Sequence, residues 1–178
     1  VEAACADARE RGAEVWPAND NVAQHVVISG TQAGVDAGGA AAKERGARRV
    51  VPIPVGGAYH TPLMAPAEER LSAALDAATF ADGAVPVVAN VDAAPHTQAA
   101  EWPGLLRRQL TGQVRWRETL ARLQAEGVVL LVEVGPGGVL TGLAKRGAPG
   151  VRALSVSQPA DVQALLSEEG IAEVGGGS

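Results

Sequence analysis

The chain has 178 residues, a net charge of −5, 47% hydrophobic and only 20% charged residues. This balance excludes a disordered protein, and without a basic stripe the sequence lacks the footprint of a nucleic-acid-binding protein. Cys5, the single cysteine, excludes an intrachain disulfide and a Cys-based zinc site, and no apolar run reaches membrane-spanning length. We expect a cytoplasmic protein with one ordinary domain or two small lobes, and no cofactor or metal.

The first part of the chain alternates helical and extended patterns. Residues 1–12 have a helical composition ending at Gly12, and residues 31–46 are an Ala-rich helical stretch ending at Gly46. Between them, the runs EVWPAND and HVVISG are joined by a polar loop and predict a β-hairpin. RRVVPIPV predicts a further strand, whose two prolines argue that at least its end lies outside a central ladder. This order suits a split-βαβ lobe that lacks its opening strand.

Beyond residue 60 the pattern changes to alternating helices and strands, which predicts an α/β sheet. VVLLVEVG is fully apolar, which indicates a parallel strand covered on both faces. We expect helices in LMAPAEERLSAALDAA, AAEWPGLLRRQL, WRETLARLQAEG, the end of GPGGVLTGLAKRG, and PADVQALLSEEG, and the other strands in VPVVAN and VRALSVS. The tail GIAEVGGGS has a flexible composition.

His60 is the first candidate catalytic residue. It follows the predicted strand VVPIPV and precedes a predicted helix, and α/β proteins place functional groups in such loops. An imidazole there can accept a proton from a nucleophile and return it to a leaving group. Position alone favours a surface histidine in a turn. The usual partner is also missing, because Ser29, Ser155 and Ser157 lack the flanking glycines of a G-x-S-x-G elbow.

Three other features have a structural interpretation beside the functional one. The loop in EVGPGGVLTGLAKR could bind phosphate, but it matches neither the P-loop nor the dinucleotide fingerprint, so a tight strand-to-helix turn is favoured. The Asn19–Asp20–Asn21 stretch is typical of a turn, because these side chains bond to nearby backbone. His25 and His96 are interpreted as structural or solvated residues.

Taken together, several motifs resemble the malonyl-CoA:acyl carrier protein transacylase family. They occur in the family's order, from about residue 1 to about residue 168: PANDN…HVVISG, GARRVVPIPVGGAYHTPLM, VPVVANVDA, RRQLTGQVRW and EVGPGGVLTGLAKR. The resemblance implies an α/β-hydrolase-like acyltransferase domain with an inserted ferredoxin-like small lobe. Residues 1–55 would be that lobe without its first strand, residues 56–170 the C-terminal part of the large domain, and residues 171–178 a flexible tail.

The resemblance also implies a mechanism and its residues. A serine attacks the malonyl thioester, and the phosphopantetheine thiol of acyl carrier protein then takes the acyl group from the acyl-serine. His60 aligns with the family's catalytic histidine, which would act as general base and then general acid. A backbone carbonyl near the family's R-Q-L segment, here at Gln109, would hold the other ring nitrogen as a neutral substitute for the acidic member of a triad.

Two further positions carry over as substrate-binding residues. Asn21 matches the second Asn of a loop that borders the active-site cleft, although Val22–His25 departs from the family's pattern after it. Tyr59 precedes the histidine, where bulk should disfavour a methyl branch, so we expect malonyl rather than methylmalonyl as the acyl group. The serine elbow and the arginine for the malonyl carboxylate match no residue here. The chain also begins at Val1 rather than Met, so we expect a C-terminal part that is inactive alone.

Two alternatives stay open. The chain could come from the acyltransferase domain of a modular polyketide synthase. It could instead be a non-catalytic homologue that docks acyl carrier protein through basic side chains. These are Arg48, Arg49, Arg107, Arg108 and Arg115. Their simpler interpretation is that they are scattered, solvated charges. The expected partners are malonyl-CoA, acyl carrier protein and the N-terminal portion of the same enzyme, with neither nucleic acid nor membrane.

Overall fold

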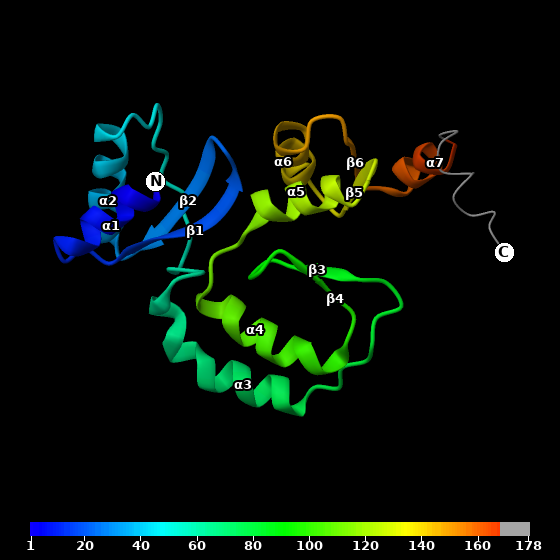
Figure 1. The fold of residues 1–178 in the computed structure, drawn as a ribbon, viewed down its shortest axis with the longest axis horizontal. Helices are drawn as coiled ribbons and strands as arrows, with labels where there is room; N and C mark the ends of the chain where they lie inside the picture. The colour runs from blue at the N-terminus through cyan, green and yellow to red at the C-terminus, as the bar shows by residue number, and fades with distance from the viewer. Residues whose placement is uncertain (168–178) are drawn as a thin grey trace. The chain divides into compact units, whose positions relative to one another are not determined.

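The computed structural model describes residues 1–167 and divides the chain into two compact units, Val1–Thr119 and a second that begins at Leu120 (Figure 1). The first unit contains α1 (Glu2–Glu10), β1 (Val15–Val22), β2 (His25–Gly30), α2 (Gln32–Glu44), η1 (Pro62–Ala67), α3 (Glu68–Ala77), β3 (Val87–Ala89), β4 (Ala94–His96), η2 (Ala99–Glu101) and α4 (Trp102–Thr111). Helix α5 (Trp116–Ala125) spans the boundary, and the second unit continues with β5 (Leu130–Val134), α6 (Val139–Gly147), β6 (Arg152–Val156) and α7 (Pro159–Ser167).

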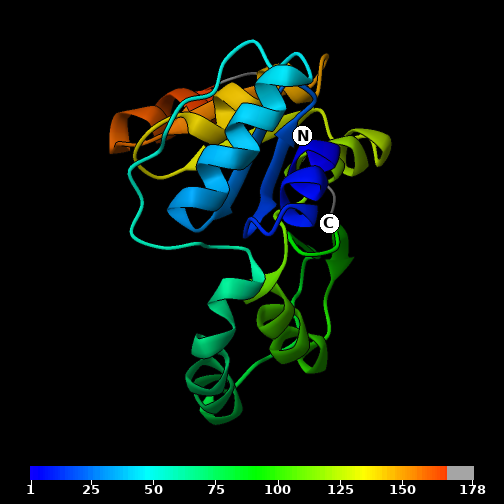
Figure 2. The same ribbon diagram turned by 90° about the vertical axis from the view of Figure 1, so that its left-hand side faces the viewer.

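The predicted β-hairpin and its two flanking helices are confirmed, but the turn predicted at Asn19–Asp20–Asn21 is wrong, because these residues lie in β1. Strands β1 and β2 pair antiparallel, and α1 and α2 lie together on one face of the hairpin (Figure 2). Small side chains make this contact close: Cys5, Ala8 and Val15 are almost completely buried and form one core cluster. The helices end near the expected glycines, since Gly12 and Gly46 both have positive φ, which glycine adopts without steric cost.

The hairpin is held by a segment nearly one hundred residues further along the chain. Asp20 N donates to Val114 O at 2.8 Å, and Val114 N donates to Ala18 O at 2.9 Å. This isolated parallel bridge occupies the edge of β1 that β2 leaves free. Strand β1 therefore lies between β2 and the segment that connects α4 to α5.

The strand predicted in RRVVPIPV is wrong, because residues 48–55 have no regular secondary structure. Val51, Ile53 and Val55 are each more than half exposed. Pro52 and Pro54 have no N–H to donate to a ladder, and the described residues supply no neighbouring strand. An apolar run becomes a strand only where a partner strand satisfies its backbone, so this segment forms no strand.

The middle of the first unit is built from α3, α4 and a short hairpin. Arg107 on α4 donates to Ser72 Oγ on α3 at 3.0 Å and pairs with Asp76. The strand predicted in VPVVAN is confirmed as β3, but the three-residue β4 was not expected, because its sequence was interpreted as a polar loop. The turn between β3 and β4 contains Ala93, a buried residue with a φ of 54°.

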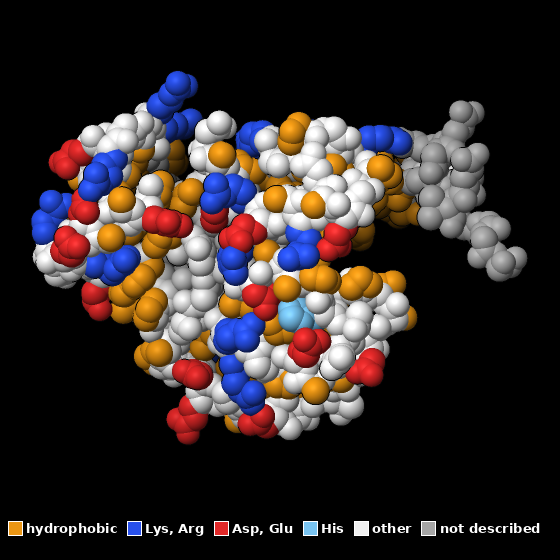
Figure 3. Space-filling view, in the orientation of Figure 1, with side chains coloured by type: hydrophobic (Ala, Val, Ile, Leu, Met, Phe, Trp, Pro, Cys, Tyr) orange, Lys and Arg blue, Asp and Glu red, His pale blue; other side chains and the backbone are white. Residues whose placement is uncertain are grey.

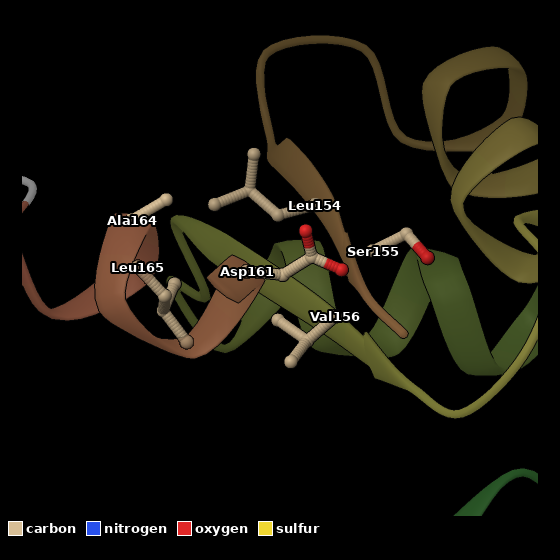
Figure 4. Close-up of a pocket in the computed structure, with 6 residues that line it drawn as sticks. All are labelled: Leu154, Ser155, Val156, Asp161, Ala164 and Leu165. Carbon is tan, nitrogen blue, oxygen red and sulfur yellow. The ribbon is translucent and has the colours of Figure 1, made fainter. Parts of the chain in front are cut away.

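The second unit contains a sheet of two parallel strands, β5 and β6. Helix α6 packs against both strands, and α7 packs against β6. A pocket of mixed polarity lies between β6 and α7, lined by Leu154, Ser155, Val156, Asp161, Ala164 and Leu165 (Figure 4). The expectation that VVLLVEVG is covered on both faces is wrong for this chain, since Val134 is 81% exposed.

The described residues thus form a mixed α/β structure, in which each helix expected from the sequence is confirmed. The last predicted helix is confirmed as far as Ser167, and the predicted flexible tail, residues 171–178, lies outside the described residues. The predicted domain boundary between residues 55 and 56 stays a prediction. Within residues 1–167, no helix is long and apolar enough to cross a bilayer.

Candidate active site

His60 lies in a tight turn between the unpaired segment and η1. Its φ of 61° is in the left-handed region, which costs an L-residue about 1–2 kcal/mol. Thr61 follows with its side chain completely buried, and its hydroxyl donates to Ala58 O at 2.6 Å. Met64 N donates to Thr61 O at 3.0 Å, which begins η1. Non-glycine residues in this conformation gather at functional sites, where the surrounding structure holds them.

The His60 ring contacts Gln109 near the C-terminal end of α4. His60 Nδ1 lies 3.2 Å from the backbone oxygen of Gln109 and 3.3 Å from its side-chain Nε2. The carbonyl can only accept, and Gln109 Nε2 already donates to Gly112 O at 3.0 Å. We therefore assign the proton to His60 Nδ1. In this tautomer Nδ1 donates to the Gln109 carbonyl, while Gln109 Nε2 keeps Gly112 O as its acceptor. The other ring nitrogen, Nε2, then carries a free lone pair and can act as a base.

The chain around Gln109 is fixed by the turn between β3 and β4. Arg108 Nη2 donates to Asp92 Oδ2 at 2.9 Å, and Arg115 N donates to Asn90 O at 2.8 Å. Gly112 makes the close approach possible, since a Cβ there would lie 2.6 Å from Arg108 O and 3.0 Å from the side chain of Val91. These contacts set the direction in which the Gln109 carbonyl points.

Acidic side chains surround His96 in the same turn region. His96 Nδ1 lies 2.9 Å from Glu101 Oε1, and Nε2 lies 3.3 Å from Asp92 Oδ1. The hydrogen bond to Glu101, followed by that to Asp92, raises the pKa of His96 above its ordinary value. His96 is thus a structural member of a charged cluster, as its interpretation from the sequence expected, with the Trp102 ring packed edge-on against it.

The other predicted site residues make no hydrogen bond to His60 or Gln109 among the described residues. Asn21 is half-buried near the end of β1, beside the irregular register around Asp20. Tyr59 adjoins His60 in sequence and is 51% exposed, with its ring close to Gly57. Both lie in the same unit as His60, so the structure brings together His60 and Gln109 but leaves Asn21 and Tyr59 without a polar link to them.

No serine in the described part of the chain is hydrogen-bonded to His60. Ser155 Oγ donates to Gly137 O at 2.7 Å, and Ser157 Oγ contacts Asp161 Oδ2 at 3.1 Å. Ser72 Oγ accepts from Arg107. The described residues also contain no group of three or more His, Cys, Asp or Glu side chains that could hold a metal ion. Within residues 1–167 the site therefore offers a base with an orienting acceptor and no serine bonded to that base.

The backbone N–H groups that follow the glycine loop, at the start of α6, bind a carboxylate of the same chain. Glu133 of β5 accepts from Leu140 N at 3.1 Å and from Thr141 N at 2.8 Å. These N–H groups, that of Thr141 first, lower the pKa of Glu133. Because a carboxylate already binds the helix N-terminus, the structural interpretation of this loop is favoured over phosphate binding.

Sequence reasoning missed two residues around the candidate site, Thr61 and Asp92. Thr61 fixes the turn that carries His60, and Asp92 binds Arg108 beside Gln109. The run His60–Thr61–Pro62 could have indicated Thr61, since a residue before proline is restricted to an extended conformation. Asp92 bonds locally to Ala94 N and His96, but its bond to Arg108 joins residues 16 positions apart and has no local signal.

Comparisons with known proteins identify relatives over most of the chain. It is 42% identical over 157 residues to the malonyl CoA-acyl carrier protein transacylase of Bacillus subtilis, and these residues cover 88% of this chain and 50% of that protein. It is 41% identical over 168 residues to the enzyme of the same name from Salmonella typhimurium, which covers 94% of this chain and 54% of that protein. No family model matches.

Solved structures give the same result. The acyl carrier protein S-malonyltransferase of Vibrio cholerae matches with a TM-score of 0.88 at 39% identity, over 92% of this chain and 53% of that chain. A malonyl-transacylase solved in complex with a type II PKS acyl-carrier protein matches with a TM-score of 0.87 at 37% identity, over 93% of this chain and 53% of that chain. The chain thus spans about half the length of the relatives it matches.

Proposed function

Starting from the membership of this chain in the malonyl CoA-acyl carrier protein transacylase family, we propose that it is the histidine-bearing, C-terminal part of a cytoplasmic enzyme. The enzyme transfers malonyl from coenzyme A to the phosphopantetheine thiol of acyl carrier protein, in fatty-acid or polyketide biosynthesis. The observation that carries this proposal is the contact between His60 Nδ1 and the Gln109 carbonyl, which leaves Nε2 available for proton transfer.

The proposed reaction has two symmetrical halves. His60 Nε2 accepts the proton of a serine hydroxyl while the serine oxygen attacks the malonyl thioester, and the imidazolium returns this proton to the departing thiolate of coenzyme A. The carrier-protein thiol then gives its proton to Nε2 and attacks the acyl-serine, and the serine oxygen leaves with that proton. The neutral Gln109 carbonyl orients the ring in both halves without adding a charge.

A second polypeptide segment supplies the serine in this proposal. The exposed side of the β5–β6 sheet supports it, because a sheet of two parallel strands is stable only when neighbours cover its faces. Val132 and Val134 are exposed on β5, and Val129 and Val139 next to it are more than 70% exposed. Covering such side chains stabilises a complex by about 25 cal/mol per Å² of apolar surface. The half of the relatives that this chain does not match is the natural source of this cover.

The finer fold assignment belongs to the same proposal. Residues 1–55 would be an incomplete ferredoxin-like lobe, and residues 56–170 part of an α/β-hydrolase-like domain. Asn21 would border the cleft. Tyr59, which precedes His60, would narrow the acyl pocket, so that malonyl is loaded faster than methylmalonyl.

The test combines this chain with the complementary N-terminal part of a relative such as the Bacillus subtilis enzyme. We expect the mixture to transfer labelled malonyl from coenzyme A to holo acyl carrier protein, and this chain alone to transfer none. His60→Ala should abolish transfer, and the matched control His25→Ala, at an exposed position on β2, should leave it intact. Transfer by this chain alone, or by the His60→Ala mixture, would falsify the proposal.

The alternative of a non-catalytic module that binds carrier protein is less well supported. Three of the five arginines named for it already have acidic partners, since Arg107 pairs with Asp76, Arg108 with Asp92 and Arg115 with Glu118. On the face shown in Figure 3, basic and acidic side chains are interspersed and form no continuous basic surface.

A further inference from the structure

We propose that Thr61 is a positioning residue for the proton transfer assigned to His60, acting through the hydrogen bond from its hydroxyl to Ala58 O. This inference rests on the proposed function for its catalytic consequence. Its structural part, the control of the His60 ring by a buried hydroxyl, is testable without any transfer activity.

The turn that carries His60 needs an external restraint. A φ of 61° is unfavourable for a histidine, so the isolated peptide prefers other conformations by about 1–2 kcal/mol. The preceding residues 48–57 have no regular secondary structure and form no ladder that could hold the turn from the N-terminal side. The restraint therefore comes from the turn itself, from the residues that follow it, or from the contact of the His60 ring with Gln109.

Thr61 supplies that restraint from both its backbone and its side chain. The side chain is 0% exposed, and its hydroxyl spans the turn to Ala58 O at 2.6 Å, so that the residues on either side of Tyr59 and His60 are tied together. Thr61 O accepts from Met64 N, which connects the same residue to η1. Pro62 restricts Thr61 to the extended conformation that it adopts, with φ of −135° and ψ of 162°.

The restraint determines where the imidazole lies. With Thr61 anchored, the His60 ring faces the Gln109 carbonyl 49 residues further along the chain, and Nδ1 lies within hydrogen-bond distance of it. Without the hydroxyl bond, the turn can relax from the left-handed conformation, and the ring moves away from this acceptor. The tautomer with a free Nε2 lone pair is then no longer fixed.

The first arm of the test uses nuclear magnetic resonance on the full chain. Long-range ¹H–¹⁵N spectra should show wild-type His60 protonated on Nδ1, with that proton protected from exchange. Thr61→Val keeps the shape of the side chain but removes the hydroxyl, so we expect mixed tautomers and loss of protection. Thr61→Ser keeps the hydroxyl and should restore the wild-type spectrum.

A matched control separates positioning from general destabilisation. Thr119 is also buried, at 3% exposure, and its hydroxyl donates to Arg115 O at 3.2 Å. Thr119→Val should leave the His60 tautomer unchanged. Amide signals of β1 and β2 report whether each variant is folded. Two outcomes overturn the proposal. One is a wild-type His60 spectrum in Thr61→Val. The other is a loss of the Nδ1 proton in Thr119→Val and Thr61→Ser as large as that in Thr61→Val.

The second arm uses the reconstituted enzyme. Misplacing a catalytic group by about 1 Å costs up to about 100-fold in rate, so Thr61→Val should lower kcat by about 10–100-fold with little change in KM for malonyl-CoA. Thr61→Ser should recover most of the loss. If wild-type reconstitution gives no transfer at all, the proposed function fails, and the spectra of the first arm still decide whether Thr61 positions the ring.

Discussion

The guanidinium of Arg117 binds the buried carboxylate of Asp20, although the two residues are 97 positions apart in the sequence. Nε and Nη2 lie 2.9 and 2.7 Å from the same oxygen, Oδ2. The Asp20 side chain is 10% exposed and that of Arg117 is 52% exposed. The pair reinforces the backbone bridge between Asp20 and Val114, so it attaches the N-terminal hairpin to the start of α5.

Replacing Asp20 by Ala should lower the free energy of unfolding by about 1.5–3 kcal/mol, the range for a hydrogen bond to a charged group. The loss should lie toward the lower end, because the half-exposed Arg117 can regain water. Urea unfolding followed by circular dichroism measures it. Asp36→Ala is the control, since this exposed carboxylate bonds only to Gln32 within α2. Equal stability of the two variants would contradict the role given to the Asp20–Arg117 pair.

The His96 cluster predicts a pH dependence of stability with a definite sign. Glu101 first, and then Asp92, raise the pKa of His96 in the folded protein, so the imidazolium binds its proton more tightly there than in the unfolded chain. The resulting stabilisation is fully present below the ordinary value of 6.5 and is lost as the pH rises through the folded-state pKa.

We therefore expect wild type to lose more stability between pH 6 and 8.5 than His96→Gln does, measured by urea unfolding at both pH values. Glu101→Gln removes the main cause of the shift and should bring the titration of His96, followed by nuclear magnetic resonance, closer to its ordinary value. Parallel pH profiles for wild type and His96→Gln would show that the cluster contributes nothing to this dependence.

Two glycines at the third position of a helix predict opposite effects of the same substitution. A Cβ at Gly34 in α2 would overlap the carbonyl oxygen of Glu14, and a Cβ at Gly104 in α4 would meet nothing within 4 Å. Gly34→Ala should therefore forbid the close packing of α2 against the hairpin and lower the melting temperature or prevent folding.

Gly104→Ala should keep or raise stability by up to about 1 kcal/mol, because alanine favours a helix more than glycine does. Thermal unfolding of the two variants side by side measures the contrast. A tolerated Gly34→Ala would mean that α2 lies further from residue 14 than the structure gives.

Glu133 should protect the backbone at the start of α6. Its carboxylate accepts from Leu140 N and Thr141 N, and its lowered pKa means that this stabilisation is present above the ordinary value of 4.5 and is lost as the pH falls through the folded-state pKa. Glu133→Gln removes the charge, so the amides of Leu140 and Thr141 should exchange faster at neutral pH. Glu126→Gln, in the same unit, removes only an exposed pair with Arg122 and should leave both rates unchanged.

Local signals in the sequence predicted most elements, and failures occurred where distant residues decide the conformation. The hairpin follows from its two extended runs and the flanking helices from the glycines near Gly12 and Gly46, whereas Asn19–Asp20–Asn21 look like a turn but lie in β1 of the hairpin. The run at residues 48–55 has the composition of a strand, but a strand needs a neighbour to bond with. Strand β4 was missed because it is three residues long and contains Pro95, and its pairing depends on a turn with Ala93 at positive φ.

The candidate site was predictable only through resemblance. Position alone made His60 a surface histidine, and its contact with Gln109 joins residues 49 positions apart, which no local pattern encodes. The anchoring by Thr61 depends on complete burial of its side chain, and Asp92 depends on partners from α4 and the segment after it. Such relationships arise from tertiary packing, so the structure is needed to see them.

The bridge from β1 to Val114 also affects the protein during its synthesis. The hairpin and its two helices are complete by residue 44, but the edge of β1 that Val114 covers, and the Asp20 carboxylate that Arg117 neutralises, wait for the chain to reach residue 117. At about 5–20 residues per second, a ribosome needs roughly 4–15 s to add the 73 residues from position 45 to position 117. Throughout this interval the nascent protein presents an open strand edge, on which a chaperone or a second nascent chain can act first.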